Sequence, residues 1–213
     1  MSKSALAHQL VAVCRNLYAH GFVTASDGNV SSRLPNGNIL ATPTSLNKGR
    51  VVESDLVEVT LDGAIVHPGR APSTELGMHL YIYRQRPDIQ AVVHAHPTYA
   101  TGFAAANIPL DQPLLPEVII GLGPIPLANI ALPSTQEMAD SIAPYVQSAS
   151  AILLANHGVV TFGKDLDDAY FKMEKVEHAA HITFVARMLG GEKVLAGEQV
   201  KRLKETFSKK KRS

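Results

Sequence analysis

Short runs of strand-favouring residues, each bounded by turn residues, limit the fold of this chain more than any other feature. The turn signals Pro35-Asn36-Gly37 and Asp62-Gly63 lie between the first of these runs, and tight turns of this kind join antiparallel neighbours. The expected strands span residues 30–34, 39–42, 56–59, 64–67, 91–96, 151–154 and 159–162, with residues 118–125 also extended. The pattern predicts a mostly antiparallel sheet.

Helical periodicity occupies the segments between these strands. In residues 4–20 apolar side chains recur at helical spacing, and Gly21 follows as a stop. Ser73 or Thr74 is a candidate cap for a second helix that ends near residue 86 and holds Glu75 in its first turn. Further helices are expected at residues 98–107, 135–146 and 165–189. Together these elements predict an α/β fold of the α+β type, with a central, mostly antiparallel sheet flanked by helices.

The length and composition of the chain suit a single compact domain. It has 213 residues, of which 46% are hydrophobic, so its core needs no disulfide to hold it together. We therefore predict one domain over residues 1–207. Residues 208–213, SKKKRS, are expected to form a basic, disordered tail because like charges favour solvation.

Charge and apolar patterning exclude several classes of protein. With 20 basic and 19 acidic side chains the net charge is only +1, which indicates a small polar partner and no nucleic acid. The single cysteine, Cys14, excludes an intramolecular disulfide, and the chain starts without the apolar core of a secretory signal, so we expect a cytoplasmic protein. The most apolar stretch, residues 114–133, contains Glu117 and several prolines, so we expect no membrane span.

The segment AVVHAHP, residues 91–97, carries the strongest chemical signal. Residues two apart on a strand point to the same side, so His94 and His96 can converge on a metal ion. Such a pair is equally compatible with ordinary polar strand residues. His157 follows a second apolar run in a tight turn, and three imidazoles would leave a coordination position open for substrate, as in catalytic sites. Glu75 is the candidate fourth group.

Five short strings give the chain a resemblance to a known family. They are SDGN (residues 26–29), TPTS (42–45), PSTE (72–75), HAH (94–96) and NHG (156–158). Their order and spacing resemble those of the class II aldolase/adducin family, in particular its L-fuculose-1-phosphate aldolase-like members. The resemblance covers nearly the whole chain and implies a three-layer fold.

The resemblance also implies the content of the site. A divalent ion, Zn²⁺ or else Mn²⁺, Co²⁺ or Fe²⁺, would lie on His94, His96 and His157, with Glu75 as a ligand at rest and a proton-transfer base during turnover. The substrate phosphate would be bound by residues from three of the strings, namely Gly28, Asn29, Thr44, Ser45, Ser73 and Thr74. The same residue types also dominate ordinary turns, which is the alternative explanation of SDGN and TPTS.

The activity implied is that of a metal-dependent lyase, and the favoured reaction is reversible aldol cleavage of a ketose 1-phosphate through a metal-stabilised enediolate. A sugar-phosphate 4-epimerase, a 3-oxo acid phosphate decarboxylase or a methylthioribulose-phosphate dehydratase of the same family are alternatives. A non-catalytic, adducin-like binding module is disfavoured because the three histidines are retained. The resemblance implies a homotetramer with active sites at subunit interfaces.

Three further residues have less certain roles. Glu117, in LLPEVIIGLG, takes the place of an aldolase tyrosine, and the resemblance implies that it reaches the site of an adjacent subunit as a second catalytic group. Lys48 could add a cationic contact to the phosphate, although loop lysines are usually solvated. His79, one helical turn after Glu75, could support Glu75 or be an ordinary helix histidine.

Overall fold

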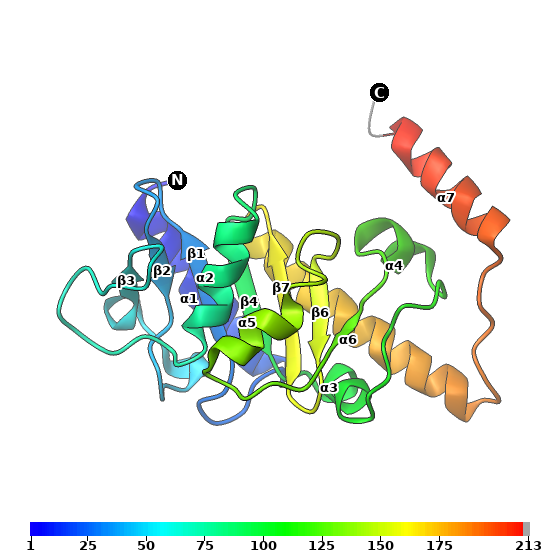
Figure 1. Ribbon diagram of the computed structural model, residues 1–213, viewed down its shortest axis with the longest axis horizontal. Coiled ribbons are helices and arrows are strands. Elements are labelled where there is room, and N and C mark those ends of the chain that lie inside the picture. The colour runs from blue at the N-terminus through cyan, green and yellow to red at the C-terminus, as the bar shows by residue number, and fades with distance from the viewer. Residues whose placement is uncertain (211–213) are drawn as a thin grey trace.

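A seven-stranded sheet forms the centre of the computed structural model, which describes residues 1–210 of the chain and side chains as far as residue 207 (Figure 1). The strand order is β3-β2-β1-β4-β7-β6-β5, and every neighbouring pair is antiparallel except β5 and β6. The prediction of a mostly antiparallel sheet is therefore confirmed. The strands are β1 (Asn29–Arg33), β2 (Ile39–Ala41), β3 (Val57–Val59), β4 (Ala91–Ala95), β5 (Leu127–Ala128), β6 (Ala151–Leu154) and β7 (Gly158–Gly163).

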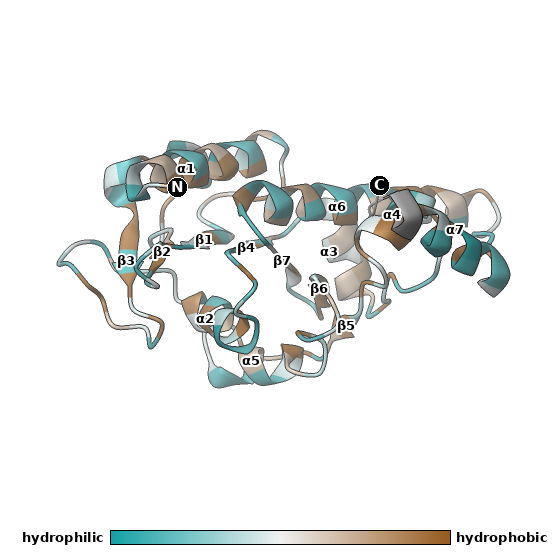
Figure 2. Ribbon diagram, turned by 90° about the horizontal axis from the view of Figure 1, so that it is seen from above, coloured by the Kyte–Doolittle hydropathy of each residue, from teal (hydrophilic) through white to brown (hydrophobic). Residues whose placement is uncertain are grey.

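Helices cover both faces of the sheet. Figure 2 shows α1 and α6 on one face and α2 and α5 on the other, which makes three layers. The helix α7 projects from the body and packs against α4 (Figure 1). The helices are α1 (Lys3–Ala19), α2 (Leu76–Gln85), α3 (Thr98–Ala105), α4 (Pro116–Gly121), α5 (Gln136–Ile142), α6 (Leu166–Met188) and α7 (Gly197–Lys210), with short 3₁₀ helices η1 (Lys48–Arg50) and η2 (Glu53–Asp55).

Strand alternation divides the interior into two cores. Val93 of β4 packs with α1, α3 and α6, whereas its neighbour Val92 packs with α2 and α5. In β7, Val159 and Val160 divide in the same way, because successive side chains of a strand point to opposite faces. All four are fully buried, and each contributes roughly 1.5–3 kcal/mol relative to an exposed position. The interior thus fixes which face each residue of β4 presents.

Two predicted strands are wrong. Residues 64–67 form no strand, and only an isolated bridge joins Ile65 to Val59. Residues 118–125 are not extended at their start, because α4 occupies residues 116–121. Pro116 stands in the first turn of α4, where a fixed φ and a missing N–H favour a helix, and this outweighs the strand preference of the following Val118.

The ends of two other elements also differ from expectation. The helix α2 begins at Leu76, so Glu75 stands in front of it as the N-cap residue and not in its first turn. At the C-terminus α7 continues to Lys210, so the first three residues of the expected disordered tail are helical, whereas residues 211–213 lie outside the described residues. None of the helices within residues 1–210 is both long and apolar enough to cross a bilayer.

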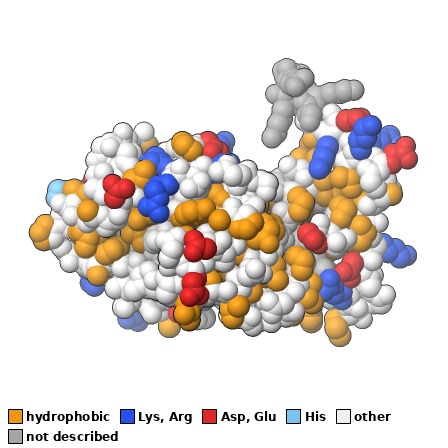
Figure 3. Space-filling view, viewed as in Figure 1, with side chains coloured by type: hydrophobic (Ala, Val, Ile, Leu, Met, Phe, Trp, Pro, Cys, Tyr) orange, Lys and Arg blue, Asp and Glu red, His pale blue; other side chains and the backbone are white. Residues whose placement is uncertain are grey.

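The surface carries charges of both signs. On the face in Figure 3, basic side chains are dispersed among acidic and apolar ones, in agreement with the net charge of +1. This distribution does not form the single basic stripe of a nucleic-acid interface on that face.

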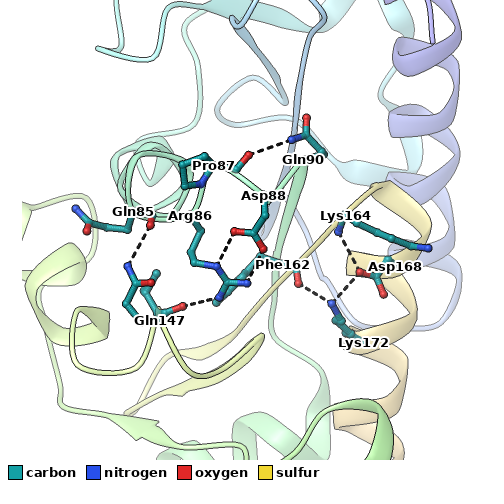
Figure 4. Close-up of polar contacts among 11 residues, drawn as sticks. Gln85, Arg86, Pro87, Asp88, Gln90, Gln147, Phe162, Lys164, Asp168 and Lys172 are labelled. Carbon is teal, nitrogen blue, oxygen red and sulfur yellow. Dashed lines mark hydrogen bonds and ion pairs between the residues drawn. The ribbon is translucent and has the colours of Figure 1, made fainter. Parts of the chain in front are cut away.

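A network of hydrogen bonds closes the end of the sheet at which β4 begins (Figure 4). Arg86 donates to both carboxylate oxygens of Asp88, at 2.8 and 2.7 Å, and to the carbonyl of Val146 at 3.0 Å. Gln147 donates to the carbonyl of Gln85 at 3.1 Å. These contacts join the end of α2 to the segment before β6, so this end of the sheet is cross-linked by polar pairs.

Candidate metal centre

Three histidines meet at the opposite end of the sheet, where β4 ends and β7 begins. His94 lies on β4, His96 follows the strand, and His157 lies in the turn between β6 and β7. They meet because β4 pairs with β7, with Ala95 opposite Val159. The Nε2 atoms of His94 and His96 are 3.1 Å apart, and one ligand atom from each of the three histidines lies within 4.8 Å of the others.

The hydrogen bonding of His94 leaves the correct nitrogen free for a metal. Its Nδ1 lies 2.9 Å from the main-chain oxygen of Val159, which can only accept, so Nδ1 carries the proton and Nε2 presents a lone pair. Burial, together with the nearby His94 and His157, lowers the pKa of His96 to about 4, so that ring is neutral at pH 7. Neutral imidazoles that converge in this way suit a divalent transition-metal ion.

Two glycines allow the backbone to approach these rings. A Cβ on Gly158 would lie 2.5 Å from Cδ2 of His96 and 2.7 Å from the carbonyl of Ala95. Gly28 has a φ of +70°, and a Cβ there would lie 2.8 Å from the carbonyl oxygen of His94. Both positions therefore require glycine, because any side chain would push the histidines out of place.

Glu75 faces the histidines from the start of α2. Its Oε1 lies 3.1 Å from Nε2 of His157, and its Oε2 lies 3.3 Å from Nε2 of His94. Asn29 donates its amide to Oε2 at 2.9 Å. Burial alone would raise the pKa of Glu75, but the adjacent His94 and His157 outweigh burial and lower it. A half-buried carboxylate beside imidazole rings is suited to bind a cation or to hold a proton.

The predicted phosphate-binding residues lie beside Glu75 on three adjacent segments. Thr42 N–H donates to the carbonyl of Val30 at 3.0 Å, and Ser73 N–H donates to the carbonyl of Thr42 at 3.2 Å. The hydroxyl of Ser73 in turn accepts from the N–H of Glu75 at 3.3 Å. The candidate residues therefore lie on three neighbouring segments, and we call the set Gly28, Asn29, Thr44, Ser45, Ser73 and Thr74 the cradle. Their role in binding stays a prediction.

The N-terminus of α2 lies next to the cradle in the chain. The helix has ten residues and starts at Leu76, so that only Glu75, its N-cap residue, separates it from Thr74. Such a terminus carries a partial positive charge and favours bound anions. A second wall, which the sequence did not indicate, faces Thr74 and Glu75 across a cavity of about 170 Å³ and comes from Ser134, Thr135, Gln136 and the following turn of α5. The Pro-Ser-Thr run before that helix was the available signal.

Asp27 is a further neighbour of the histidines. Its Oδ2 lies 3.9 Å from Nδ1 of His96, and it accepts from the hydroxyl of Thr24 at 3.2 Å. In the sequence Asp27 stood only as one residue of the string SDGN, with no role of its own. Its position beside a candidate ligand became visible through the fold alone.

Lys48 and His79 lie behind the site. Lys48 is only 1% exposed, so it cannot make the solvent-facing contact that the sequence suggested. His79 is equally buried, and its Nδ1 bonds to the hydroxyl of Ser31 at 2.7 Å. Burial lowers the pKa of His79 to about 3, so it is neutral and packs beneath Glu75 as part of the interior.

Within one chain, Glu117 is not brought to the histidines. It is exposed in the first turn of α4, a helix that packs against α6 and α7. The apolar residues that flank Glu117 in the sequence therefore do not bury its side chain within the single chain. The prediction that it serves the site of a neighbouring subunit stays a prediction.

Comparison with known proteins agrees with this geometry. The model of the Class II Aldolase and Adducin N-terminal domain matches residues 8–184. A 3-oxo-tetronate 4-phosphate decarboxylase from Escherichia coli O6:H1 is 35% identical over 188 residues, 86% of this chain and 88% of that protein. An L-fuculose phosphate aldolase from Methanococcus maripaludis is 35% identical over 182 residues, 85% of this chain and 97% of that protein.

Solved structures show the same architecture. An L-fuculose 1-phosphate aldolase is similar with a TM-score of 0.88 and 32% identity, over 98% of this chain and 98% of that protein. Residues 8–184, which the family model matches, include the three histidines, Glu75 and all six residues of the cradle. The chain therefore belongs to the class II aldolase and adducin N-terminal domain family.

Proposed function

We propose that this protein is a metal-dependent lyase that breaks a carbon–carbon bond in a small phosphorylated substrate, with aldol cleavage of a ketose 1-phosphate as its reaction. One observation carries the proposal. Three imidazoles and the carboxylate of Glu75 converge beside a hydroxyl-bearing cradle at the N-terminus of a helix. The similarity to L-fuculose phosphate aldolases and 3-oxo-tetronate 4-phosphate decarboxylases supports the same class of chemistry.

The donor set fits a bound divalent ion, with zinc first and manganese, cobalt or iron as alternatives. His94, His96 and His157 would hold the ion, and Glu75 would complete the set at rest. When bound, the ion would act as a Lewis acid that stabilises negative charge on the substrate carbonyl oxygen. No lysine Schiff base is then required.

Aldol cleavage requires two proton movements. The hydroxyl proton on C4 of the ketose leaves, the C3–C4 bond breaks to release an aldehyde, and its electron pair passes into the C2 carbonyl to give an enediolate. A proton then returns to C3. Glu75 is placed to hold one of these protons on Oε2, since Asn29 orients that oxygen and the carboxylate is largely screened from solvent.

The phosphate would lie in the cradle. The hydroxyls of Thr44, Ser45 and Ser73 supply donors, and the start of α2 supplies a partial positive charge, without a surface cation. Binding energy from this end of the substrate would orient the bond that breaks. We therefore expect a strong preference for phosphorylated over unphosphorylated substrates.

Decarboxylation of a 3-oxo acid phosphate is the second candidate. Loss of carbon dioxide sends the same electron pair into a ketone, but no hydroxyl proton has to be removed. Within the single chain Glu75 is the more enclosed of the carboxylates beside the histidines, Asp27 is largely open to solvent, and Glu117 lies elsewhere on the surface. Aldol cleavage with two acid–base groups thus depends on a neighbouring subunit, and decarboxylation does not.

We also propose a cytoplasmic location, which is consistent with the single buried, unpaired Cys14. We further propose a homotetramer in which Glu117 completes the site of an adjacent subunit. The Glu117 carboxylate would protonate the leaving group or move a proton opposite Glu75. Conversion of Glu117 to Gln should lower turnover while metal content and assembly persist. An active monomer in solution scattering would contradict this arrangement.

The test of the reaction is a product screen with metal-loaded enzyme. Ketose 1-phosphates, aldehydes with a ketone donor, and 3-oxo acid phosphates are offered in parallel, and products are identified by mass spectrometry. Aldehyde release from a ketose 1-phosphate supports the proposal. Release of carbon dioxide without aldehyde would replace it with the second candidate, and metal-independent activity would remove both.

A further inference from the structure

Lys48 lies in an unusual place for a lysine. It begins η1, is 1% exposed, and belongs to the largest fully buried side chains of the protein. The following Gly49 packs on α1 so closely that a Cβ would lie 2.5 Å from the ring of Tyr18. Burial of an ammonium group without compensation is strongly unfavourable, so its surroundings must provide acceptors.

These acceptors belong to two different loops. The Nζ of Lys48 donates to the carbonyl of Ser26 at 2.8 Å and to the carbonyl of Leu46 at 2.7 Å. The adjacent Asn47 adds another tie, because its amide donates to the carbonyl of Ala25 at 2.7 Å. We call residues 24–28 the first loop and residues 43–47 the second loop. Both loops form part of the cradle.

Both loops have backbone conformations that need support. In the first loop Ala25 has a φ of 45° and Gly28 a φ of 70°, and in the second loop Ser45 has a φ of 56°. A non-glycine residue in this left-handed region costs free energy and persists only where neighbouring contacts hold it. Lys48 and Asn47 donate to the carbonyl groups beside these residues.

The charge of Lys48 is not cancelled by an ion pair among the described residues. Its Nζ bonds only to carbonyl oxygens, which favour the protonated amine. Burial lowers the pKa of Lys48, while Cys14 and the carboxylates of Asp27 and Glu75 oppose that effect. Burial also raises the pKa of Cys14 to about 12, so this thiol remains neutral at pH 7 and forms no ion pair with Lys48.

We propose that Lys48 is a positioning residue for phosphate binding, in which its buried ammonium group joins the first and second loops and adds positive potential beneath the cradle. It acts through the loops and does not touch the substrate. The proposal rests on the proposed function, because it assumes that the cradle takes a phosphate. It explains how an anion site with no surface lysine is held in shape.

The test measures binding of inorganic phosphate to the metal-loaded enzyme by isothermal titration calorimetry. Lys48→Met removes the charge and both ties, Lys48→Gln keeps a donor without the charge, and Asn47→Ala removes only the neighbouring tie. Lys172→Met is the matched control. Lys172 also donates to a main-chain carbonyl, that of Phe162 at 3.0 Å, but at the opposite end of the sheet (Figure 4).

We expect Lys48→Met to weaken phosphate binding by about tenfold or more, since hydrogen bonds from charged groups to the two loops are lost. Asn47→Ala should have a smaller effect, and Lys48→Gln an intermediate one. Lys172→Met should leave phosphate affinity within about twofold of the wild type, because the sites are distant, although both methionine variants lower the melting temperature. Metal content and circular dichroism identify any variant that fails to fold. If Lys48→Met fails to fold, phosphate binding by Lys48→Gln and Asn47→Ala tests the proposal instead.

Two outcomes separate this inference from the proposed function. If the wild type binds phosphate in the cradle, shown by weaker binding in Ser73→Ala, and the Lys48 variants bind it equally well, Lys48 has no positioning role. If the wild type binds no phosphate, or binds it without sensitivity to Ser73→Ala, the cradle is not an anion site. That result would overturn the phosphate part of the proposed function and the role of Lys48 with it.

Discussion

The two ends of the sheet treat buried polar groups in opposite ways. Where β4 begins, Arg86 pairs with Asp88, and Lys172 pairs with Asp168 at 2.8 Å (Figure 4). Where β4 ends, more buried polar atoms remain unpaired among the described residues, namely Oδ1 of Asn29, Nε2 of His79 and Nδ1 of His157, than where it begins, which leaves Nε of Arg33 unpaired. Buried polar atoms are normally satisfied, so the first end is built for stability and the second is arranged for something that the protein binds.

This difference has an energetic consequence. Each buried, unpaired polar atom costs roughly 1–3 kcal/mol, so the histidine end lowers the free energy of unfolding of the unliganded chain. A ligand that binds only the folded chain raises this free energy of unfolding again. We therefore expect substitutions at the histidine end to act on binding and turnover, and those at the opposite end to act on stability.

The largest effect should come from removing a candidate metal ligand. In His94→Ala the ion loses a nitrogen donor held in place by the Val159 carbonyl, so we expect metal content to fall from a single ion per chain to none and activity to disappear. Elemental analysis of the purified protein measures this directly. His178→Ala, on the exposed side of α6, is the control and should keep its ion. A full complement of metal in His94→Ala would break the comparison.

Glu75→Gln should give the next largest effect. The amide keeps the shape of the side chain but cannot exchange a proton, so we expect kcat to fall by roughly 10²–10⁴. Steady-state kinetics with the substrate found in the product screen measures the change. Asp168→Asn, the equivalent substitution at the opposite end, should leave kcat unaltered. Equal losses in the two variants would mean that carboxylates at either end serve only stability.

Arg86→Met tests the opposite end of the sheet, where β4 begins. It removes the hydrogen bonds to Asp88 and to the Val146 carbonyl, and we expect the free energy of unfolding to fall by about 1–3 kcal/mol. Denaturant unfolding monitored by circular dichroism gives this value, with Arg15→Met on the exposed side of α1 as control. Metal content and kcat should not change. A drop in metal binding here would show that the two ends are coupled.

The smallest effect concerns the pH dependence of Asp168. Burial alone would raise its pKa, but hydrogen bonds from Lys172 and the Lys164 N–H lower it. A lowered folded pKa stabilises the protein above the unfolded value and loses that contribution as pH falls through the folded one. Asp168→Asn should therefore lower the free energy of unfolding at pH 7 by about 0.5–1 kcal/mol for this partly exposed pair, and the difference from the wild type should disappear as the pH falls through the folded pKa of Asp168. A difference that persists in acid would contradict this cause.

Local patterns predicted much of the fold and part of the candidate site. His94 and His96 are brought together by the two-residue repeat of a strand, which the sequence shows directly. The approach of Asn29 and His157 depends on the strand order, with β1 and β7 on either side of β4. No local pattern encodes that order, so the sequence offered His157 only as a candidate third ligand, and the family resemblance placed Asn29 at the site.

The errors had physical causes of the same kind. The β-branched residues after Pro116 favour a strand, but contacts with α6 and α7 and a proline in the first turn favour the helix α4. Residues 197–207 carried no assignment, although they form most of α7. Lys48 would be solvated in most loops, and it is buried only because η1 packs against α1. Tertiary contacts decided each case.

The hydrogen bond from His94 to Val159 has a consequence for how this protein can change over generations. Its acceptor is a main-chain oxygen, so no side-chain substitution at Val159 can delete it. The orientation of His94 is tied to the pairing of β4 with β7, and it persists through any drift in sequence that preserves this pairing. The sequences of the surrounding loops can then change and accept new substrates while the His94 ring keeps its orientation. A family with one metal-binding geometry and several reactions is the expected result.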